Sequence, residues 1–377
     1  MNETPLLHPA LLPSGLRDVL PPEAELEARS VAAIMDCFAT HGYDRVEPPL
    51  LEFEDSLFAG SGAATADQAF RLMDPESQRM MALRADTTPQ IDRLAATRLT
   101  NAPRPLRLAY AGQCLRIRGS HLQPERQIAQ AGIELIGNDT AAADAEIILT
   151  AVDALAAIGL SSLSIDLTIP RLVPTLLNGT PAGRKQPLAH ALDRKDAAAV
   201  AELSGNPLLL QLLNASGPAE RGVPALLALD LPSDTKAQVE RLADTVAAIR
   251  RVKPGLPITV DPVEFRGYQY HTGICMTLFA PGRQAELGRG GRYVCGDAEP
   301  ATGITLYPDT ITRLAPRPSL RPRIYLPYGT QASNAAACRA EGFATVGGLA
   351  PESDHKTEAR RLGCSHIFFN GTKTPLA

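Results

Sequence analysis

Strand-like segments occur in runs along this chain of 377 residues and do not alternate regularly with helices. The stretches "PLRLAYAGQCLRI" and "QIAQAGIELIG" flank the polar stretch "RGSHLQPER", an arrangement typical of two strands joined by a functional loop. The short apolar runs "RLMD" and "MMALRADTTPQ", split by "PESQ", predict a hairpin. Runs of neighbouring strands favour an antiparallel sheet with helices on one face, in an α+β fold.

Two other regions differ from this pattern. Residues 171 to 255 are rich in Leu and Ala, and helical segments such as "TKAQVERLADTVAAIRRV" recur there, which indicates a helical insertion. The proline-rich stretch "APRPSLRPR" predicts a linker, and the strand and helix signals beyond it predict a small βαβαβ unit with a parallel sheet. We therefore expect a core of residues 1–315, a linker of residues 316–323 and a C-terminal domain of residues 324–377.

Charge and residue spacing exclude several classes of protein. The 37 basic and 41 acidic residues give a net charge of -4, so nucleic acid is not an expected partner. The six cysteines form no CxxC pair, which is typical of reduced thiols in a cytoplasmic protein. The histidines lack the spacing of a metal site, and no segment is apolar for long enough to span a membrane. We expect no metal, no other cofactor and no membrane partner.

Polar side chains cluster in four strand-like segments. The segments are "LRADTTPQ", "CLRIR", "QAGIELIG" and "RGYQYHTG" with the later "LGRGGRY". Gln130 and Glu134 are four residues apart, which places them on one face of a strand. Arg116 can hold a carboxylate in a two-pronged fork, and Asp86 can meet an ammonium group. A bulge at Gly267 would re-aim the side chains around it. Each cluster alone is more typical of a solvated strand face, but together they describe a pocket for a zwitterion.

The order of these clusters resembles the catalytic core of class II aminoacyl-tRNA synthetases, and among them histidyl-tRNA synthetase. "PSGLRDVLPPEAELEARS" is similar to the dimer-forming first motif, and "LRADTTPQ" resembles the family's "LRPEGT". "CLRIRGSHLQPERQIAQAGIELIG" has the length of the second motif and its loop. "RGYQYHTG" resembles the histidine-specific "RGLDYYTG", and "GRGGRY" resembles "AGGRYDGL". The resemblance covers about residues 10 to 315, without much of the helical insertion.

This resemblance implies a pocket for histidine. Asp86 and Thr88 match residues that hold the α-amino group of the amino acid. Glu134 and His271 match residues that read the imidazole, the latter being a tyrosine in the synthetase. Arg266 matches an arginine near the carboxylate. The complete set of implied histidine-binding residues is Asp86, Thr88, Arg116, Gln130, Glu134, Arg266, Tyr270, His271 and Tyr293.

The residues that would bind ATP do not match the synthetase pattern. The glutamate expected two residues after the second-motif arginine is Arg118, and the basic residue of the following loop is Pro124. Where synthetases have "GFALGLER", this chain has "GITLYPDT", so that Thr310 stands in place of the third-motif arginine. We also expect Pro308 to disrupt the turn from strand to helix. Without these charges nothing would stabilise a bound triphosphate.

A second family shares these departures. "LRADTTPQIDR", "ERQIAQAGIELIG" and "RGYQYHTG" closely resemble the ATP phosphoribosyltransferase regulatory subunits of histidine biosynthesis. The resemblance implies a non-catalytic chain that binds L-histidine for feedback inhibition. It also implies a self-dimer and a hetero-octamer with a short-form ATP phosphoribosyltransferase catalytic subunit. The alternatives are an active histidyl-tRNA synthetase-like ligase and a non-catalytic tRNA-binding module.

Overall fold

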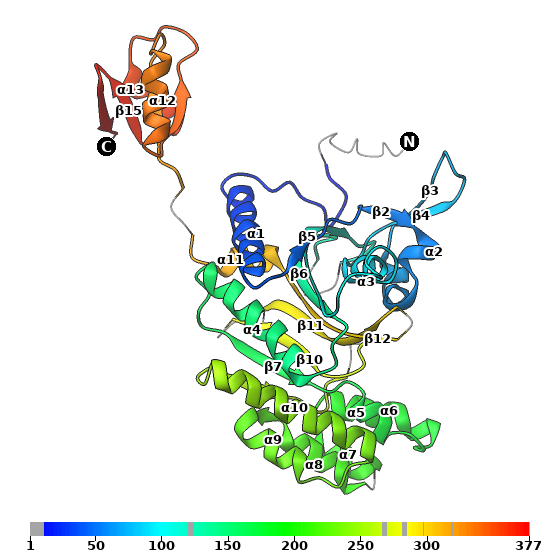
Figure 1. The fold of residues 1–377 in the computed structure, drawn as a ribbon. Helices are drawn as coiled ribbons and strands as arrows, with labels where there is room; N and C mark the ends of the chain where they lie inside the picture. The colour runs from blue at the N-terminus through cyan, green and yellow to red at the C-terminus, as the bar shows by residue number, and fades with distance from the viewer. Residues whose placement is uncertain are drawn as a thin grey trace, which may run out of the picture. The chain divides into compact units, whose positions relative to one another are not determined.

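The chain divides into two compact units, Met1–Pro316 and Arg317–Ala377 (Figure 1). The computed structural model describes residues 11–119, 124–204, 206–265, 270–280, 285–296, 298–317 and 320–376. Arg266 and Gly267, for which a ligand contact and a bulge were predicted, lie outside these ranges. Among the described helices, none has the length and apolar character needed to cross a membrane.

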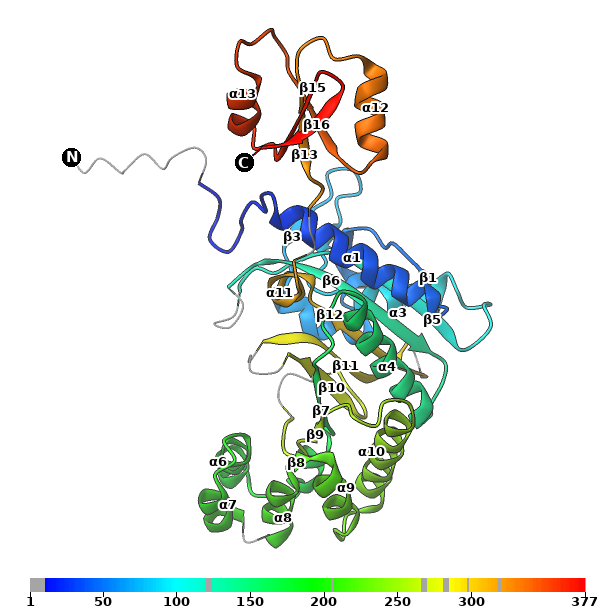
Figure 2. The same cartoon turned by 90° about the vertical axis from the view of Figure 1, so that its left-hand side faces the viewer.

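A nine-stranded sheet forms the centre of the first unit within the described residues (Figures 1 and 2). In spatial order its strands are β1 (Asp44–Arg45), β5 (Leu106–Leu115), β6 (Gln127–Ile136), β12 (Glu299–Leu306), β11 (Glu286–Cys295), β10 (Cys275–Phe279), β7 (Ser164–Thr168), β9 (Ile258–Val260) and β8 (Gly217–Pro218). All pairs from β5 to β7 are antiparallel, whereas β1–β5 and β7–β9 are parallel. The antiparallel pairing predicted for the sheet is thus confirmed at its centre.

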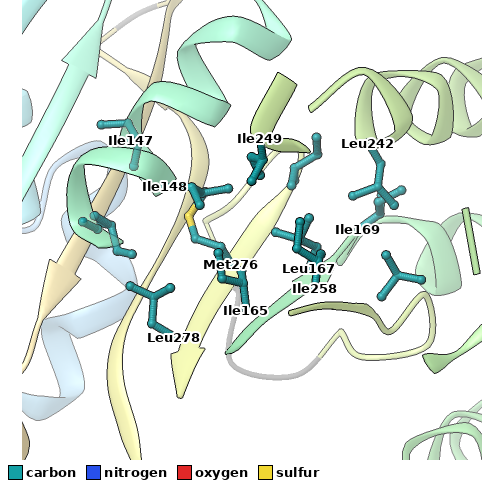
Figure 3. Close-up of a cluster of buried hydrophobic side chains, with 14 of the residues drawn as sticks. Ile147, Ile148, Ile165, Leu167, Ile169, Leu242, Ile249, Ile258, Met276 and Leu278 are labelled. Atoms are coloured by element: carbon teal, nitrogen blue, oxygen red, sulfur yellow. The ribbon is translucent and has the colours of Figure 1, made fainter. Parts of the chain in front are cut away.

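Helices α1 (Glu23–Thr40), α4 (Ala141–Ala157) and α10 (Ser233–Val252) share one apolar core with one face of the sheet. Figure 3 shows part of that core, where Ile148 of α4 and Ile249 of α10 lie near the strand residue Met276, and Leu242 of α10 lies near Ile169. The helix predicted after Pro21-Pro22 is confirmed as α1, and the chain leaves it at Gly42 with φ at 82°. Helix α3 (Thr88–Thr97) packs its apolar side chains in a second core with the opposite face of the sheet.

The alternation of side chains along β6 separates these two faces. Ala131, Ile133 and Leu135 belong to the core beneath α1 and α4, because successive side chains of a strand point to opposite sides. Gln130 and Glu134 therefore share the face on which α3 lies. The predicted strand pair around the polar loop is confirmed by the antiparallel register of β5 and β6.

Short helices occupy most of the stretch between β7 and β9. They are α5 (Leu172–Leu176), α6 (Ala182–Asp193), α7 (Ala197–Ser204), α8 (Pro207–Ala215) and α9 (Ala219–Leu227). Figure 2 shows α6 to α9 gathered near the β9 and β8 edge of the sheet. The predicted hairpin is confirmed as β3 (Arg71–Met73) and β4 (Met80–Leu83), which form a small sheet with β2 (Leu51–Phe53). Helix α2 (Glu54–Leu57) and a 3₁₀ helix (Gly60–Gln68) lie between β2 and β3 in the chain.

The second unit contains a four-stranded sheet with the order β14-β13-β15-β16. Its elements are β13 (Arg323–Leu326), α12 (Ala332–Ala340), β14 (Ala344–Gly347), α13 (His355–Arg361), β15 (His366–Phe369) and β16 (Thr372–Pro375). The predicted parallel βαβαβ pattern is confirmed for β13, β14 and β15, but β16 is antiparallel to β15 and was not predicted. Asn370 and Gly371 have φ values of 51° and 75°, as a two-residue hairpin turn requires.

Candidate functional site

Glu134 lies at the centre of the candidate site and is only 1% exposed. Its carboxylate accepts hydrogen bonds from Thr88 Oγ1 at 3.0 Å and from the Tyr293 hydroxyl at 3.1 Å. Thr88 begins α3 and Tyr293 comes from β11, so three elements converge on this side chain. Gly303 faces Glu134 across the β12–β6 pair, and a Cβ atom there would overlap the carboxylate. Only glycine therefore fits at position 303 of β12.

The environment of Glu134 favours its neutral form. Burial raises the pKa of this carboxyl to about 8, although the hydrogen bonds from Thr88 and Tyr293 act to lower it. Within the described part of the chain no lysine or arginine forms an ion pair with it. A buried acid of this kind gains most from a ligand that brings its own basic nitrogen.

Gln130 orients a second carboxyl group near the start of α3. The Gln130 Nε2 atom donates to Asp86 Oδ1 at 3.1 Å, while its Oε1 atom accepts from the backbone amide of Thr87 at 3.0 Å and from the Thr87 hydroxyl at 2.9 Å. These bonds fix which end of the amide faces Asp86. Asp86 is partly exposed, so its other oxygen can receive an ammonium group. Gln130 and Asp86, which were both predicted to lie in one pocket, are thus in direct contact.

Three rings, those of Tyr270, His271 and Tyr293, pack against one another beside Glu134. The rings of Tyr270 and His271 stack at 4.2 Å between centroids, and Tyr270 meets Tyr293 edge to face at 5.9 Å. Burial, and secondarily the charge of Arg289, lowers the pKa of His271 to about 3, so its imidazole is neutral. The prediction that these residues lie in a strand is wrong: Tyr270 and His271 precede β10 in irregular backbone. Likewise, Asp86 and Thr88 lie at the transition from β4 to α3.

These groups border a narrow cavity of about 10 Å³, which has room for about one water molecule. Its polar lining includes Thr88, Glu134, Tyr270, His271, Arg289 and Tyr293. Arg289 and Tyr293 each lie two residues from Gly291 along β11. Residues at this spacing point to the same side of a strand, so all three face the cavity. No group of three or more His, Cys, Asp or Glu side chains suited to a metal ion occurs among the residues that the structure describes.

The predicted site residue Arg116 and the nearby motif residue Arg292 do not line the cavity. The Nε atom of Arg116 donates to the backbone oxygen of Ala85 at 3.4 Å, which places Arg116 beside Asp86 and not in the lining around Glu134. Arg292, which belongs to the same glycine-rich motif as Tyr293, points to the other face of the sheet and pairs with Asp144 at 2.7 Å. The alternation along β11 causes this separation.

The region around Thr310 carries charges of both signs. Thr310 is buried in α11 (Pro308–Leu314) and lines a small pocket with Asp309, Glu125 and Arg313, and its hydroxyl accepts a hydrogen bond from Arg313 at 3.3 Å. Burial raises the pKa of Asp309. The expectation that Pro308 disrupts the strand-to-helix turn is wrong, because Pro308 occupies the first turn of the helix, where proline is favoured.

Several residues near Glu134 were not predicted from the sequence. Tyr110 of β5 donates or accepts a hydrogen bond with Thr305 at 2.7 Å and lies 3.5 Å from Glu134 Oε1. Gly132 is required next to it, because a Cβ atom would come within 2.5 Å of the tyrosine ring. Glycines inside strand patterns, such as the one in "ATGITL", were the available signal for these close approaches.

The sheet, with the Thr88 helix on one face, defines a class II aminoacyl-tRNA synthetase-like protein. A family model described as histidyl-tRNA synthetase matches residues 15–311. The structure of histidyl-tRNA synthetase from Nostoc sp. PCC 7120 is similar with a TM-score of 0.77 at 18% identity, over 96% of this chain and 92% of that one. An ATP phosphoribosyltransferase regulatory subunit/histidyl-tRNA synthetase from Bacillus halodurans C has a TM-score of 0.80 at 24% identity, over 96% and 97% of the two chains. The predicted fold class is confirmed.

Sequence relatives narrow this class. The ATP phosphoribosyltransferase regulatory subunit of Gluconobacter oxydans is 51% identical over 100% of this chain and 99% of its own length. That of Paramagnetospirillum magneticum is 53% identical over 95% of both chains. The chain belongs to the ATP phosphoribosyltransferase regulatory subunit family. Membership confirms the prediction of a regulatory, non-catalytic chain of histidine biosynthesis.

Proposed function

We propose that this chain binds L-histidine beside Glu134 and Asp86 and transmits this signal to a catalytic subunit of ATP phosphoribosyltransferase. The observation that carries the proposal is the buried carboxyl of Glu134, which is held by two hydroxyl donors and borders a cavity. An imidazole nitrogen placed against this carboxyl would form a hydrogen bond with it in a buried site, and the positive charge of a protonated ring would favour the carboxylate form. The catalytic partner is proposed from the names of the relatives.

The second end of the ligand would be recognised at Asp86. Its carboxylate is oriented by Gln130 and partly exposed, as an ammonium partner requires. Arg116 lies next to Asp86 through its contact with Ala85, so a ligand carboxylate can reach its guanidinium. The rings of Tyr270 and His271 stack within the cavity wall, and we propose that they move apart when histidine enters. Arg266 is proposed as a further contact from its match to the synthetase motif.

The proposed assembly is a cytoplasmic hetero-octamer with a short-form catalytic subunit, built on a dimer of this chain. A ligase function is disfavoured by Thr310, which stands where the synthetase motif has an arginine, and by the Asp309 carboxylate beside it, which opposes a triphosphate; the nearby Arg313 pairs with Glu125. A pyrophosphate-exchange assay with histidine and ATP measures that alternative directly, and robust exchange would refute a purely regulatory role. Salt-dependent binding to tRNA would instead favour a nucleic-acid module.

The direct test of the pocket is isothermal titration calorimetry with L-histidine. Glu134→Ala should weaken binding by roughly 1 to 3 kcal/mol, because the imidazole donor is left without its acceptor. Glu146→Ala is the matched control, since Glu146 is a partly buried glutamate that pairs with Arg107 on the other face of the sheet. Unchanged affinity in Glu134→Ala would remove Glu134 from the site.

Copurification with a short-form catalytic chain tests the regulatory step. The wild-type complex should show phosphoribosyltransferase activity that histidine inhibits. The complex with Glu134→Ala should remain active and lose much of this inhibition. Light scattering of the same sample measures the proposed hetero-octamer. Inhibition of equal strength in both complexes would place the inhibitory histidine site outside this cavity.

A further inference from the structure

A buried carboxylate joins the candidate site to the helical region of the first unit. Asp144 of α4 has a fully buried side chain and receives two arginines. Arg292 of β11 approaches Asp144 Oδ1 at 2.7 Å through Nη2 and at 3.0 Å through Nε. Arg241 of α10 approaches Asp144 Oδ2 at 3.0 Å. We call these three residues the Asp144 cluster.

The Asp144 cluster is anchored at the first turn of α4. Arg292 also donates to the backbone oxygens of Asn138 at 3.0 Å and Thr140 at 3.3 Å. The exposed Asp139 pairs with Arg241 at 2.9 Å and with Arg292 at 3.2 Å. Burying such charges costs desolvation energy, so a buried ion pair is weak evidence for a stabilising role and fits a role in fixing geometry.

Arg292 stands between two parts of the cavity wall. Its neighbour Tyr293 donates to Glu134, and its neighbour Gly291 leaves room for His271, whose Cδ2 atom would be 2.6 Å from a Cβ placed there. The backbone of Arg292 also pairs with the segment that follows His271. The Thr272 amide donates to the Arg292 oxygen at 2.8 Å, and the Arg292 amide donates to the Ile274 oxygen at 2.8 Å. A shift of Arg292 therefore moves both walls.

Arg241 provides the connection to α10. The apolar side chains Leu242 and Ile249 hold this helix in the core shown in Figure 3, independently of the ion pairs. Arg241 reaches from this helix to the same carboxylate that holds Arg292. A displacement of α10 along α4 thus changes the position of Asp144 relative to β11.

We propose that Asp144 is a positioning residue, which locks β11 to α4 and α10 and thereby couples the helical region to the affinity of the cavity for histidine. The ligand in this inference rests on the proposed function. The coupling runs through Arg241, Asp144 and Arg292, none of which borders the cavity. Rigid side-chain contacts that join two elements are a physical route for such coupling.

The test uses Arg241→Gln in the full-length chain. Arg292 still neutralises Asp144 in this variant, and the apolar contacts of α10 remain, so the chain is expected to fold. Arg250→Gln is the matched control, because Arg250 lies on the same helix but pairs with Glu220 of α9 and with the Pro254 oxygen. In calorimetry, Arg241→Gln should weaken histidine binding about fivefold or more, and the control should not.

A second measurement needs no ligand. Amide hydrogen exchange at Thr272 and Arg292 should be about fivefold faster or more in Arg241→Gln and unchanged in Arg250→Gln. The reason is that the bonds from the Thr272 amide to the Arg292 oxygen and from the Arg292 amide to the Ile274 oxygen lose an anchor in Arg241→Gln. Equal exchange rates in wild type and Arg241→Gln would overturn the positioning role, and so would a histidine affinity within twofold of wild type. Wild-type protein that binds no histidine would overturn the coupling to affinity and the proposed function together, while faster exchange would still support the positioning role.

Discussion

Replacing Glu134 by glutamine should make the protein more stable at alkaline pH. The carboxyl is fully buried, and burial raises its pKa to about 8. At pH values above this, the folded chain must carry a charge in a site where Thr88 and Tyr293 supply only hydroxyl donors. Glutamine has nearly the same shape, can bond with both hydroxyls and carries no charge. The substitution therefore removes the cost of the charge and keeps the packing.

The magnitude follows from the shifted pKa. Below the ordinary value of 4.5 the carboxyl is protonated in both folded and unfolded chains, and its contribution to stability is fully present. Between 4.5 and about 8 the folded chain keeps a proton that the unfolded chain has lost, so the free energy of unfolding falls by about 1.4 kcal/mol per pH unit. Over this interval the fall amounts to roughly 5 kcal/mol, and above pH 8 no more is lost.

Urea unfolding of the ligand-free proteins at pH 5, 7 and 9 measures this difference. The advantage of Glu134→Gln over wild type should grow from pH 5 to pH 9, by several kcal/mol at most. Glu146→Gln is the control of opposite sign: burial acts to raise the pKa of Glu146, but hydrogen bonds from Arg107 and Tyr43 lower it overall, so its loss should destabilise the protein at neutral pH. A difference between Glu134→Gln and wild type that is constant with pH would refute the reasoning.

Other substitutions test separate parts of the structure. Gly303→Ala should abolish histidine binding in calorimetry and destabilise the fold by about 1 to 3 kcal/mol in urea, because the added methyl group overlaps the Glu134 carboxylate; normal binding would contradict the position of β12. Asp144→Ala should cost about 3 to 5 kcal/mol in the same unfolding assay, because it removes the buried carboxylate that the buried Arg292 and the partly buried Arg241 share; a loss below 1 kcal/mol would contradict this. Thr310→Arg should not create pyrophosphate exchange, since the Asp309 carboxylate remains beside it; measurable exchange would show that one arginine suffices.

Local residue patterns in the sequence were sufficient to predict strand β6, which carries two residues of the candidate site. The even spacing of Gln130 and Glu134 placed both on one face of β6, and the apolar residues between them lie in the core on the other face. Asp86 and Thr88 were expected in a strand because their segment begins with apolar residues. Their carboxyl and hydroxyl groups instead precede or begin α3, where Pro89 in the first turn favours a helix. Glycine and proline therefore gave stronger signals than apolar runs in this chain.

Contacts between distant segments could not be predicted in this way. Arg292 and Tyr293 are adjacent in the same glycine-rich motif, yet one pairs with Asp144 of α4 and the other with Glu134 of β6. The pairing depends on which face of β11 meets α4, and that is set by the order of strands in the sheet. Strand β16, in contrast, could have been predicted from the sequence. Its turn at Asn370 and Gly371 is an Asn-Gly pair, which is a sequence signal for a hairpin.

The third-motif region retains a structural task even though its arginine is absent. Strand β12 pairs with β6 only as far as Leu306 opposite Ala131, so the sheet cannot supply a partner for the amide of Ala129 on that side. Asp309 accepts this amide at 3.0 Å from the first turn of α11. The carboxylate thus extends the support of β6 to the residue next to Gln130, which orients Asp86 in the pocket. The carboxylate of Asp309, which we propose disfavours a nucleotide, therefore also helps to hold the strand that bears the proposed histidine site.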